Sequence, residues 1–240
     1  NYHSMETAIL TGSEGQIGQS FVSRLKALDY NVIGIDIVDQ VNDGIIYHRA
    51  DITKKHEIES VLKQHNENIT VLINNAGTSV FSPFEERTED QIDMVMNVNL
   101  KGNILMTQLV YNKYFKVNNN GNIINIGSIY GIVSGDMSIY NEDDRRTPEI
   151  YGATKAAVIN LTKYFATYMA PDNVRVNCIS PGGIYNNQAK KFIENYSRKV
   201  PMNRMGYADE LLSSLEYLLS DESSYVTGQN IVVDGGFTCW

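Results

Sequence analysis

The stretch Thr7–Gly18, TAILTGSEGQIG, decides the fold of this 240-residue chain. A short apolar strand, Thr7–Thr11, leads directly into three glycines spaced three residues apart, Gly12, Gly15 and Gly18. Apolar side chains at helical spacing follow, at Ile17, Phe21, Leu25 and Leu28. A strand that turns tightly through glycines into an amphipathic helix is typical of the first unit of a parallel α/β sheet.

The alternation of apolar strands and amphipathic helices continues along the chain. We predict further strands at Val32–Ile37, Tyr47–Ala50, Val71–Asn75, Asn122–Gly127, Val174–Ser180 and Ile231–Val233, and helices at Lys54–Glu67, Glu89–Lys116, Glu149–Met169 and Asp209–Leu219. This order predicts one α/β domain over residues 1–240, a doubly wound parallel sheet with helices on both faces. Ligands of such sheets bind beyond the carboxyl ends of the strands.

The composition narrows the class of protein. Hydrophobic residues make up 42% and charged residues 20%, as in ordinary globular domains. The net charge of −8 argues against a nucleic-acid binder, which would carry a basic face, and gives no support to an anionic membrane as partner. No apolar run of about 18 residues is present, so no membrane span is expected.

Cysteine and histidine usage predicts neither a disulfide framework nor a metal site. The chain has two cysteines, Cys178 and Cys239, and four histidines at no metal-binding spacing. The N-terminal segment is too short and polar for a secretory signal, so a reducing cytoplasm is the predicted location. We interpret Met5 as the native start, with residues 1–4 an added remnant; the alternative is that residues 1–5 are a disordered start.

The glycine loop predicts a site for the phosphates of a dinucleotide. Glycines permit a tight turn and a close approach of pyrophosphate to the backbone, and the following helix offers free N–H groups and a positive dipole end. The alternative is a strand-to-helix turn without a ligand. The residues expected at this site are Gly12, Ser13, Glu14, Gly15, Gln16, Ile17 and Gly18.

Asp36, near the end of the second strand, predicts NAD rather than NADP. A carboxylate about 20 residues beyond the glycine loop binds both adenosine ribose hydroxyls and repels a 2′-phosphate. No Lys or Arg stands in the glycine loop or beside Asp36 in the sequence, and Glu14 disfavours NADP further. The alternative is that Asp36 only ends a strand and that Asp39 contacts the ribose.

Tyr151 and Lys155 form the candidate catalytic pair. Their four-residue spacing places both side chains on one face of a predicted helix, where the ammonium favours the phenolate. Such a tyrosine can give or take a proton during carbonyl reduction or alcohol oxidation. Ser128, directly after the fifth strand, can hydrogen-bond a substrate oxygen or merely cap a turn. Asn99 lies within a long helix, where Asn is unfavourable, and a water-holding kink or solvent exposure would explain it.

Together these residues resemble the short-chain dehydrogenase/reductases, in the single-domain branch with a Rossmann-type fold. The resemblance runs from Thr11 to Gly236. Besides the residues above, it includes Asp51 after the third strand, NNAG at 74–77, PGG at 181–183 and DGG at 234–236. Motifs in this number and order are not expected by chance.

The resemblance implies a role for each of these residues. Tyr151 would be the acid and base, Lys155 would hold the nicotinamide ribose, Ser128 would orient the reacting oxygen, and Asn99 would hold a water that relays protons through Lys155. Further cofactor contacts are implied for Asp51 and Ile52 beside the adenine, for Asn75, Ala76 and Gly77 along the adenosine side, and for Pro181, Gly182 and Ile184 at the nicotinamide.

Three departures from the family pattern stand out. Only two residues separate Gly12 from Gly15, where this branch usually has three. Asn186 stands where a threonine often contacts the carboxamide. Ser128 and Tyr151 are 23 residues apart, about ten more than is typical, because of a segment at 135–149. We expect this insertion on the substrate side, as a pocket wall or lid, with Arg145 and Arg146 either gripping an anion or lying in a solvated turn.

The function implied is an NAD(H)-dependent oxidoreductase that interconverts a secondary alcohol and a ketone. The insertion and the C-terminal segment resemble a bacterial subgroup near surface-glycan and flagellin-modification enzymes, which favours a sugar or nucleotide-linked sugar as substrate. The alternatives are an acyl-thioester ketone reductase and a catalytically silent NAD-binding regulator. The resemblance also implies a homodimer or homotetramer packed through the helices that begin at Glu89 and Glu149, with Phe237 and Trp240 as possible additions.

Overall fold

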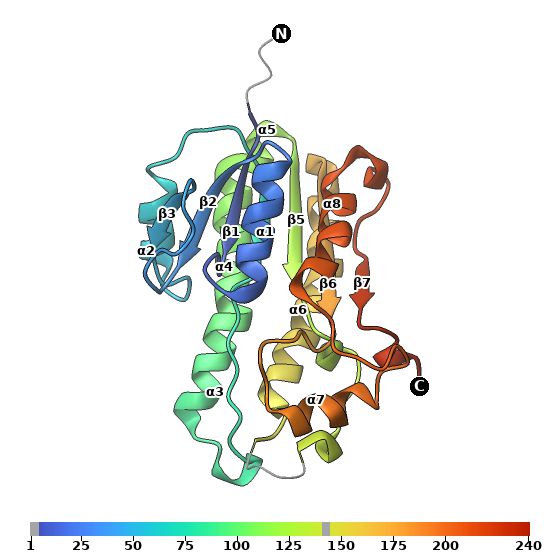
Figure 1. Cartoon of the computed structure of the whole chain (residues 1–240). Coiled ribbons are helices and arrows are strands. Elements are labelled where there is room, and N and C mark those ends of the chain that lie inside the picture. The colour runs from blue at the N-terminus through green and yellow to red at the C-terminus, as the bar shows by residue number, and fades with distance from the viewer. Residues whose placement is uncertain (1–4, 141–144) are drawn as a thin grey trace.

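A seven-stranded sheet forms the centre of the molecule in the computed structural model, which describes residues 5–140 and 145–240 (Figure 1). Its order is β3-β2-β1-β4-β5-β6-β7, and every neighbouring pair is parallel. The predicted doubly wound parallel sheet is therefore confirmed. The strands are β1 (Thr7–Thr11), β2 (Asn31–Asp36), β3 (Ile46–Arg49), β4 (Ile69–Asn74), β5 (Gly121–Ile126), β6 (Val174–Pro181) and β7 (Asn230–Val233).

Helices cover both faces of the sheet, and the strands divide their side chains between two cores. Ala8 and Leu10 pack with α1 and α8, whereas Ile9 between them packs with α2, α4 and α6, because successive strand residues face opposite sides. The helices are α1 (Gln16–Ala27), α2 (Lys55–Leu62), α3 (Glu89–Met96), α4 (Asn103–Val110), α5 (Lys116–Asn118), α6 (Glu149–Met169), α7 (Lys190–Ser197) and α8 (Leu212–Leu219).

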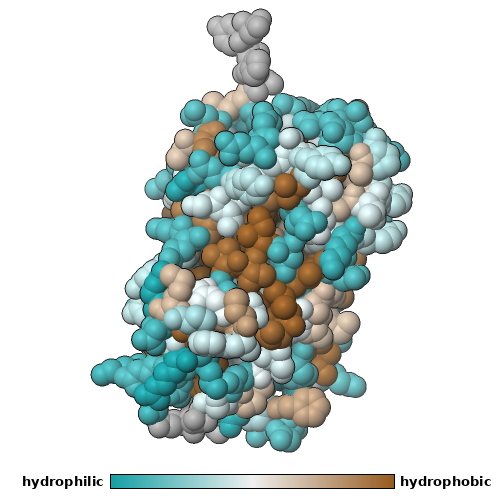
Figure 2. Space-filling view, turned by 90° about the vertical axis from the view of Figure 1, so that its right-hand side faces the viewer, coloured by the Kyte–Doolittle hydropathy of each residue, from teal (hydrophilic) through white to brown (hydrophobic). Residues whose placement is uncertain are grey.

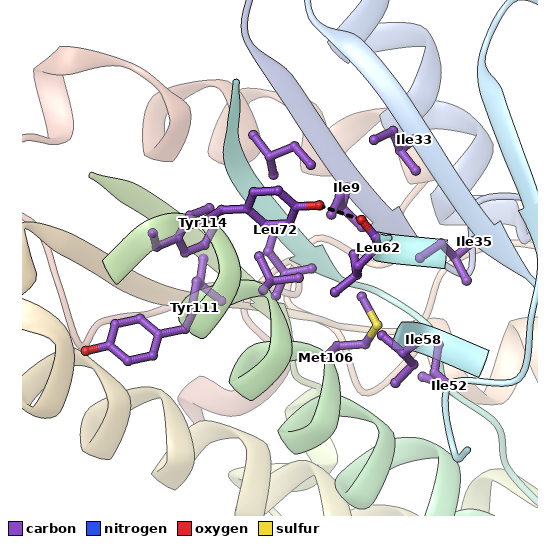
Figure 3. Close-up of a cluster of buried hydrophobic side chains, with 14 of the residues drawn as sticks. Ile9, Ile33, Ile35, Ile52, Ile58, Leu62, Leu72, Met106, Tyr111 and Tyr114 are labelled. Atoms are coloured by element: carbon purple, nitrogen blue, oxygen red, sulfur yellow. Dashed lines mark hydrogen bonds between the residues drawn. The ribbon is translucent and has the colours of Figure 1, made fainter. Parts of the chain in front are cut away.

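Helix α2 ends at Leu62, earlier than the predicted Lys54–Glu67, and a neighbouring helical segment supplies donors to the carbonyls at and just beyond this end. The Tyr114 hydroxyl donates to the carbonyls of Leu62 and His65, at 3.1 Å each, and Lys113 Nζ donates to the same two groups. Figure 3 shows Tyr114 reaching Leu62 across the apolar cluster that contains Ile58 and Met106. These bonds add side-chain donors to the last carbonyl of α2 and to one carbonyl in the turn that follows it.

The long helix predicted from Glu89 to Lys116 is helical throughout but not regular. Between α3 and α4, residues Asn97–Gly102 form a π-helical segment, and Tyr111–Phe115 form a second one between α4 and α5. A π-helical turn holds an extra residue compared with an α-helix and is frequent at functional sites. Asn99 lies in the first of these segments, so its unfavourable position in a helix coincides with a local irregularity.

Helix α7 was not predicted from the sequence. Its Phe192 and Tyr196 pack with Tyr140 of the insertion and with Phe237 in a third apolar cluster. Figure 1 shows α7 beyond the carboxyl ends of the strands, apart from the two main helix layers. Phe237 is buried within this cluster of its own chain, contrary to the expectation that it joins a subunit interface, whereas Trp240 is exposed.

The remaining predicted boundaries differ only slightly from those observed. Most strand ends shift by one or two residues, and α8 begins at Leu212 after a short helical turn at Ala208–Leu211 rather than at Asp209. The predicted helix Glu149–Met169 agrees with α6. In the part of the chain that the structure describes, no helix has the length and apolar character needed to cross a membrane.

We expect Tyr114→Phe to lower the free energy of unfolding by about 1 kcal/mol. The variant keeps the buried ring but removes a hydroxyl that serves two carbonyls at the end of α2. Urea denaturation checks this, with Tyr225→Phe as the control because Tyr225 is fully exposed. Equal stability of Tyr114→Phe and the wild type would contradict the capping role.

Candidate active site

Two connected cavities lie at the carboxyl ends of the strands. One is a groove of about 750 Å³ that runs past the glycine loop, Asp36 and Asp51. The other is a pocket of about 420 Å³ that contains Ser128, Tyr151 and Lys155. Both are lined by Ile17, Asn75, Gly77 and Thr78, so the two spaces meet at the ends of β1 and β4.

The glycine loop is shaped by two glycines that admit no side chain. Gly12 has a φ of +67°, and a Cβ added to it would lie 2.8 Å from Ala76 Cα. A Cβ on Gly18 would lie 2.0 Å from the carbonyl oxygen of Gly12. Gly15 is the N-cap of α1, and no such clash surrounds it. The loop therefore wraps back on the start of α1 and turns the helix N-terminus towards the groove.

Most of the predicted loop residues line the groove. Ser13 does not, because it is fully buried and its hydroxyl donates to Glu14 Oε1 at 3.0 Å. Gly18 packs under the loop and does not line the groove either. The predicted residues that line it are Gly12, Glu14, Gly15, Gln16 and Ile17.

Asp36 lies in the groove with its carboxylate held by two backbone donors. Glu14 N–H donates to its Oδ2 at 3.0 Å, and Ile37 N–H donates to its Oδ1 at 2.7 Å. A carboxylate has about four acceptor positions, so each oxygen retains capacity for one more donor. That arrangement suits the pair of hydroxyls of a ribose.

Arg49 is a nearby cation that reading along the sequence missed. It stands opposite Asp36 in the register of β2 and β3, and its Nε donates to the carbonyl of Ile37 at 2.9 Å. Its guanidinium also pairs with Asp39 at 3.2 Å on the open surface. Asp39, the alternative ribose contact, is not among the described residues that line the groove. Strand pairing, not sequence distance, places an arginine beside Asp36.

The other predicted contacts, Asp51, Ile52, Asn75, Ala76 and Gly77, also line the groove. Burial tends to raise the pKa of Asp51, but hydrogen bonds from the Thr53 hydroxyl and N–H, together with Lys54, leave it below the usual value. The carboxylate therefore stays ionised and fixes the turn that leads into α2.

Ser128, Tyr151 and Lys155 come together in the pocket. Lys155 is buried, its Nζ donates to the carbonyl of Ile126 at 2.8 Å, and it lies 5.6 Å from the centroid of the Tyr151 ring. The Ser128 side chain accepts a hydrogen bond from Tyr130 N–H at 3.1 Å. The hydroxyls of Ser128 and Tyr151 and the ammonium of Lys155 thus share one small pocket, as the sequence predicted.

Asn99 lies behind this group and does not line the pocket. Its Oδ1 accepts from Thr78 N–H at 2.8 Å, and its Nδ2 donates to the Thr78 carbonyl at 3.0 Å and to Thr154 Oγ1 at 3.2 Å. The side chain thus ties the π-helical segment to the loop after β4 and to α6, one residue before Lys155. Its observed contacts are those of a positioning residue.

The loop after β6 forms the far side of the pocket. Pro181, Gly182 and Ile184 line it as predicted. Asn186 does not line it, and its N–H donates to Gln188 Oε1 at 2.7 Å. Gln188 lines the pocket instead, two residues beyond the position that family resemblance pointed to.

Hydroxyl-bearing side chains that the sequence did not single out complete the wall. Thr147 Oγ1 donates to the Tyr140 hydroxyl at 2.8 Å, and the Tyr130 hydroxyl interacts with both. Burial raises the pKa of Tyr130 far above its ordinary value and that of Tyr196 to about 12, so both stay neutral. Two features of the sequence pointed to these wall residues. Tyr130 closely follows Ser128, and Phe192 and Tyr196 are four residues apart, the spacing of one helix face.

The insertion at 135–149 contributes to the pocket through Tyr140 and Thr147, while residues 141–144 lie outside the described residues. Arg145 stacks over the Phe81 ring at 4.3 Å, and Arg146 N–H donates to the Phe81 carbonyl at 3.0 Å. Neither arginine is among the described residues that line the pocket, so an anion grip by them stays a prediction.

The histidines do not assemble a metal site in the described ranges. No group of three or more His, Cys, Asp or Glu side chains among residues 5–140 and 145–240 is placed to hold a metal ion. His48 and His65 contact each other through their Nε2 atoms at 2.7 Å, away from both cavities. Cys178 is buried, and burial raises its pKa to about 11.

Comparison with known proteins agrees with this geometry. Residues 17–238 match a family model described as enoyl-(acyl carrier protein) reductase. The chain is 30% identical to an NAD-dependent glycerol dehydrogenase of Listeria innocua, over 97% of this chain and 94% of that protein. This chain belongs to the short-chain dehydrogenase/reductase family.

Two further relatives bear on the subgroup and on the fold. The chain is 30% identical to post-translational flagellin modification protein A of Campylobacter coli, over 86% of this chain and 83% of that protein. It superposes with a TM-score of 0.91 on a crystal structure of a short-chain dehydrogenase from Leptospira borgpetersenii with bound NAD+, at 43% identity over 98% of this chain and 93% of that one.

We expect Asp36→Asn to weaken NADH binding about tenfold and to strengthen NADPH binding. The variant loses charge-assisted hydrogen bonds to the ribose and the repulsion of a 2′-phosphate, next to the cation of Arg49. Fluorescence titration of both cofactors measures this. An unchanged ratio of the two affinities would contradict the placement of the ribose at Asp36, and Arg49→Gln in the Asp36→Asn background should remove the gain for NADPH.

Proposed function

We propose that the protein is an NAD(H)-dependent oxidoreductase that interconverts a secondary alcohol and a ketone on a small, uncharged, hydroxyl-rich substrate such as a sugar or polyol. One observation carries this proposal. The space beside Ser128, Tyr151 and Lys155 opens on one side into the groove with Asp36 and is walled on the other by the hydroxyls of Tyr140 and Thr147.

The residues of the groove fit a bound NAD. The close approach of Gly12 to Ala76 leaves backbone, not side chain, facing the phosphates, and Asp36 keeps acceptor capacity for the ribose. The NAD dependence of the Listeria innocua relative and the NAD+ in the Leptospira borgpetersenii structure support the same choice. When bound, the cofactor supplies or accepts the hydride, and the protein manages positions and one proton.

In the direction of ketone reduction, the Tyr151 hydroxyl donates its proton to the carbonyl oxygen, and it takes a proton back when an alcohol is oxidised. Ser128 donates a hydrogen bond to the same oxygen and so orients it. The ammonium of Lys155, held by the Ile126 carbonyl, stabilises the phenolate that forms. Asn99 holds the loop after β4 and the first turns of α6 in position around Ser128, Tyr151 and Lys155.

The polarity of the pocket supports a neutral substrate. Lys155 is the single charged side chain among the described residues that line it, and its Nζ is bound to a backbone carbonyl. Recognition therefore depends on hydroxyls, the Gln188 amide and aromatic faces, which suit a polyhydroxylated carbon skeleton. A glycerol dehydrogenase and a flagellin modification protein among the relatives support this class, with a role in glycan modification as the narrower possibility.

A second candidate is reduction of an acyl-thioester ketone, because the description of the matching family model names an acyl-thioester substrate, although one reduced at a carbon–carbon double bond. Such a carrier would bring phosphate groups to the pocket mouth, and the pocket offers no cation beyond Lys155 among its described lining. Turnover of NADH with keto-sugars, nucleotide-linked keto-sugars and acetoacetyl thioesters separates the two. Binding of NADH without turnover of any of them would favour the catalytically silent regulator.

We also propose a homo-oligomer that acts in the cytoplasm. Tyr164 and Tyr168 on α6 are more than half exposed and stack on one another, and apolar side chains gather on the side that carries α8 and β7 (Figure 2). Val232 of the edge strand β7 is one of the exposed apolar residues there. Light scattering after gel filtration measures the oligomeric state.

Tyr151→Phe should lower kcat by a factor of about 10² to 10⁴ while NADH still binds. The variant keeps the ring against Lys155 but cannot exchange a proton with the substrate oxygen. Steady-state kinetics with the best substrate of the panel, together with NADH fluorescence, measure the two effects. Retained turnover would contradict the assignment of Tyr151 as the acid and base.

Tyr140→Phe should raise KM for a polyhydroxylated substrate about 3- to 10-fold, the cost of one neutral hydrogen bond, and leave kcat nearly unchanged. It should not alter KM for a ketone without further hydroxyls, because the ring and its packing on Phe192 remain. Tyr217→Phe on α8 is the control. An equal effect on both substrates would show a structural role for Tyr140 rather than recognition of a second hydroxyl.

A further inference from the structure

Glu14, in the middle of the glycine loop, is almost completely buried despite its charge. Its side chain is 7% exposed, although the loop itself borders an open groove. A buried carboxylate is costly unless donors surround it. The donors to this carboxylate are therefore informative about its role.

Four donors surround the Glu14 carboxylate. Oε1 accepts from the Ser13 hydroxyl at 3.0 Å. Oε2 accepts from Val41 N–H at 2.8 Å, from Asn42 N–H at 2.9 Å and from Asn42 Nδ2 at 3.1 Å. Three donors saturate Oε2, and Oε1, which has one donor, belongs to a residue that is only 7% exposed, so the protein itself holds this carboxylate rather than presenting it to a ligand.

These bonds join two segments that are distant in the sequence. The segment after β2, residues 37–42, supplies Ile37 and Val38 to the groove wall, and both are exposed apolar side chains. Asn42 Nδ2 also donates to the Ser13 carbonyl at 3.0 Å, so the glycine loop holds this segment through its backbone as well. The N–H of Glu14 meanwhile donates to Asp36 at the start of the same segment.

We propose that Glu14 is a positioning residue for the adenosine end of the groove, which raises affinity for NAD(H) by pinning residues 37–42 to the glycine loop without touching the cofactor. The proposal rests on the proposed NAD-dependent function. This role differs from the one that the sequence suggests, in which Glu14 contacts the cofactor and repels a 2′-phosphate. Burial tends to raise the pKa of Glu14, but the N–H groups of Asn42 and Val41 outweigh it and keep the pKa below the usual value, so the anion persists.

The test compares Glu14→Ala with Glu14→Gln, Asn42→Ala and the control Asp43→Asn, which removes one exposed charge directly after this segment. Fluorescence titration gives the dissociation constants of NADH and NADPH, and hydrogen exchange reports the amides of residues 37–43. We expect Glu14→Ala to weaken NADH binding at least tenfold without improving NADPH binding. Glu14→Gln and Asn42→Ala should fall between Glu14→Ala and the wild type, and Asp43→Asn should match the wild type.

Hydrogen exchange in the cofactor-free protein separates the two roles of Glu14. Loss of a direct contact with the cofactor would leave the exchange rates unchanged, whereas loss of a positioning role would raise them. Faster exchange at Val41 and Asn42 in the cofactor-free Glu14→Gln protein supports the proposal. A gain in NADPH affinity with unchanged NADH affinity would overturn it in favour of direct charge repulsion, and unchanged affinities and exchange would overturn it outright. If Glu14→Ala does not fold, Glu14→Gln and Asn42→Ala decide the question. Failure of the wild type to bind NADH would instead overturn the proposed function, and this inference with it.

Discussion

The backbone of Gly12 lies so close to that of Ala76 that no side chain fits between them, and the site depends on this contact. Thr11 Oγ1 reinforces it by accepting the N–H groups of Asn75 and Ala76, at 3.1 and 3.0 Å. The contact joins the ends of β1 and β4, between which the sheet reverses its direction of winding. The groove and the pocket meet there, so the contact between Gly12 and Ala76 fixes the position of the two cavities relative to each other.

The parts of the molecule that could be predicted from sequence are those that local chemistry determines. Apolar runs bounded by loops identified every strand, and the glycine triplet and the Tyr151–Lys155 spacing identified the loop and the helix that hold the site. In each case the informative residues lie within a few positions of each other. The order of the strands followed because alternating strands and helices permit few arrangements.

The parts that could not be predicted depend on how distant segments pack. Tyr140 and Thr147 join Tyr130 only after the insertion folds against α7, and Arg49 reaches Asp36 only through the register of two strands. The orientation of the Glu14 side chain could not be predicted either. Its partners Val41 and Asn42 donate mainly through backbone N–H groups, which nearly every residue type has. Helix α7 is short, and its apolar face is completed by residues from elsewhere in the chain.

The π-helical segment at Asn97–Gly102 has a consequence for how the chain tolerates changes in length. Removing one residue there would restore a regular α-helix and leave α3 nearly in place relative to α4, because the π-helical turn already accommodates one extra residue. Val95 in α3 would stay buried, but the residues of the π-helical segment would shift and Asn99 would lose its hydrogen bonds to Thr78. The insertion at 135–149 is different, since Ser128 and Tyr151 are anchored by β5 and α6 on either side of it. A change of length in the insertion would thus reshape the wall of the pocket, whereas a deletion in the π-helical segment would release the loop after β4 that Asn99 holds.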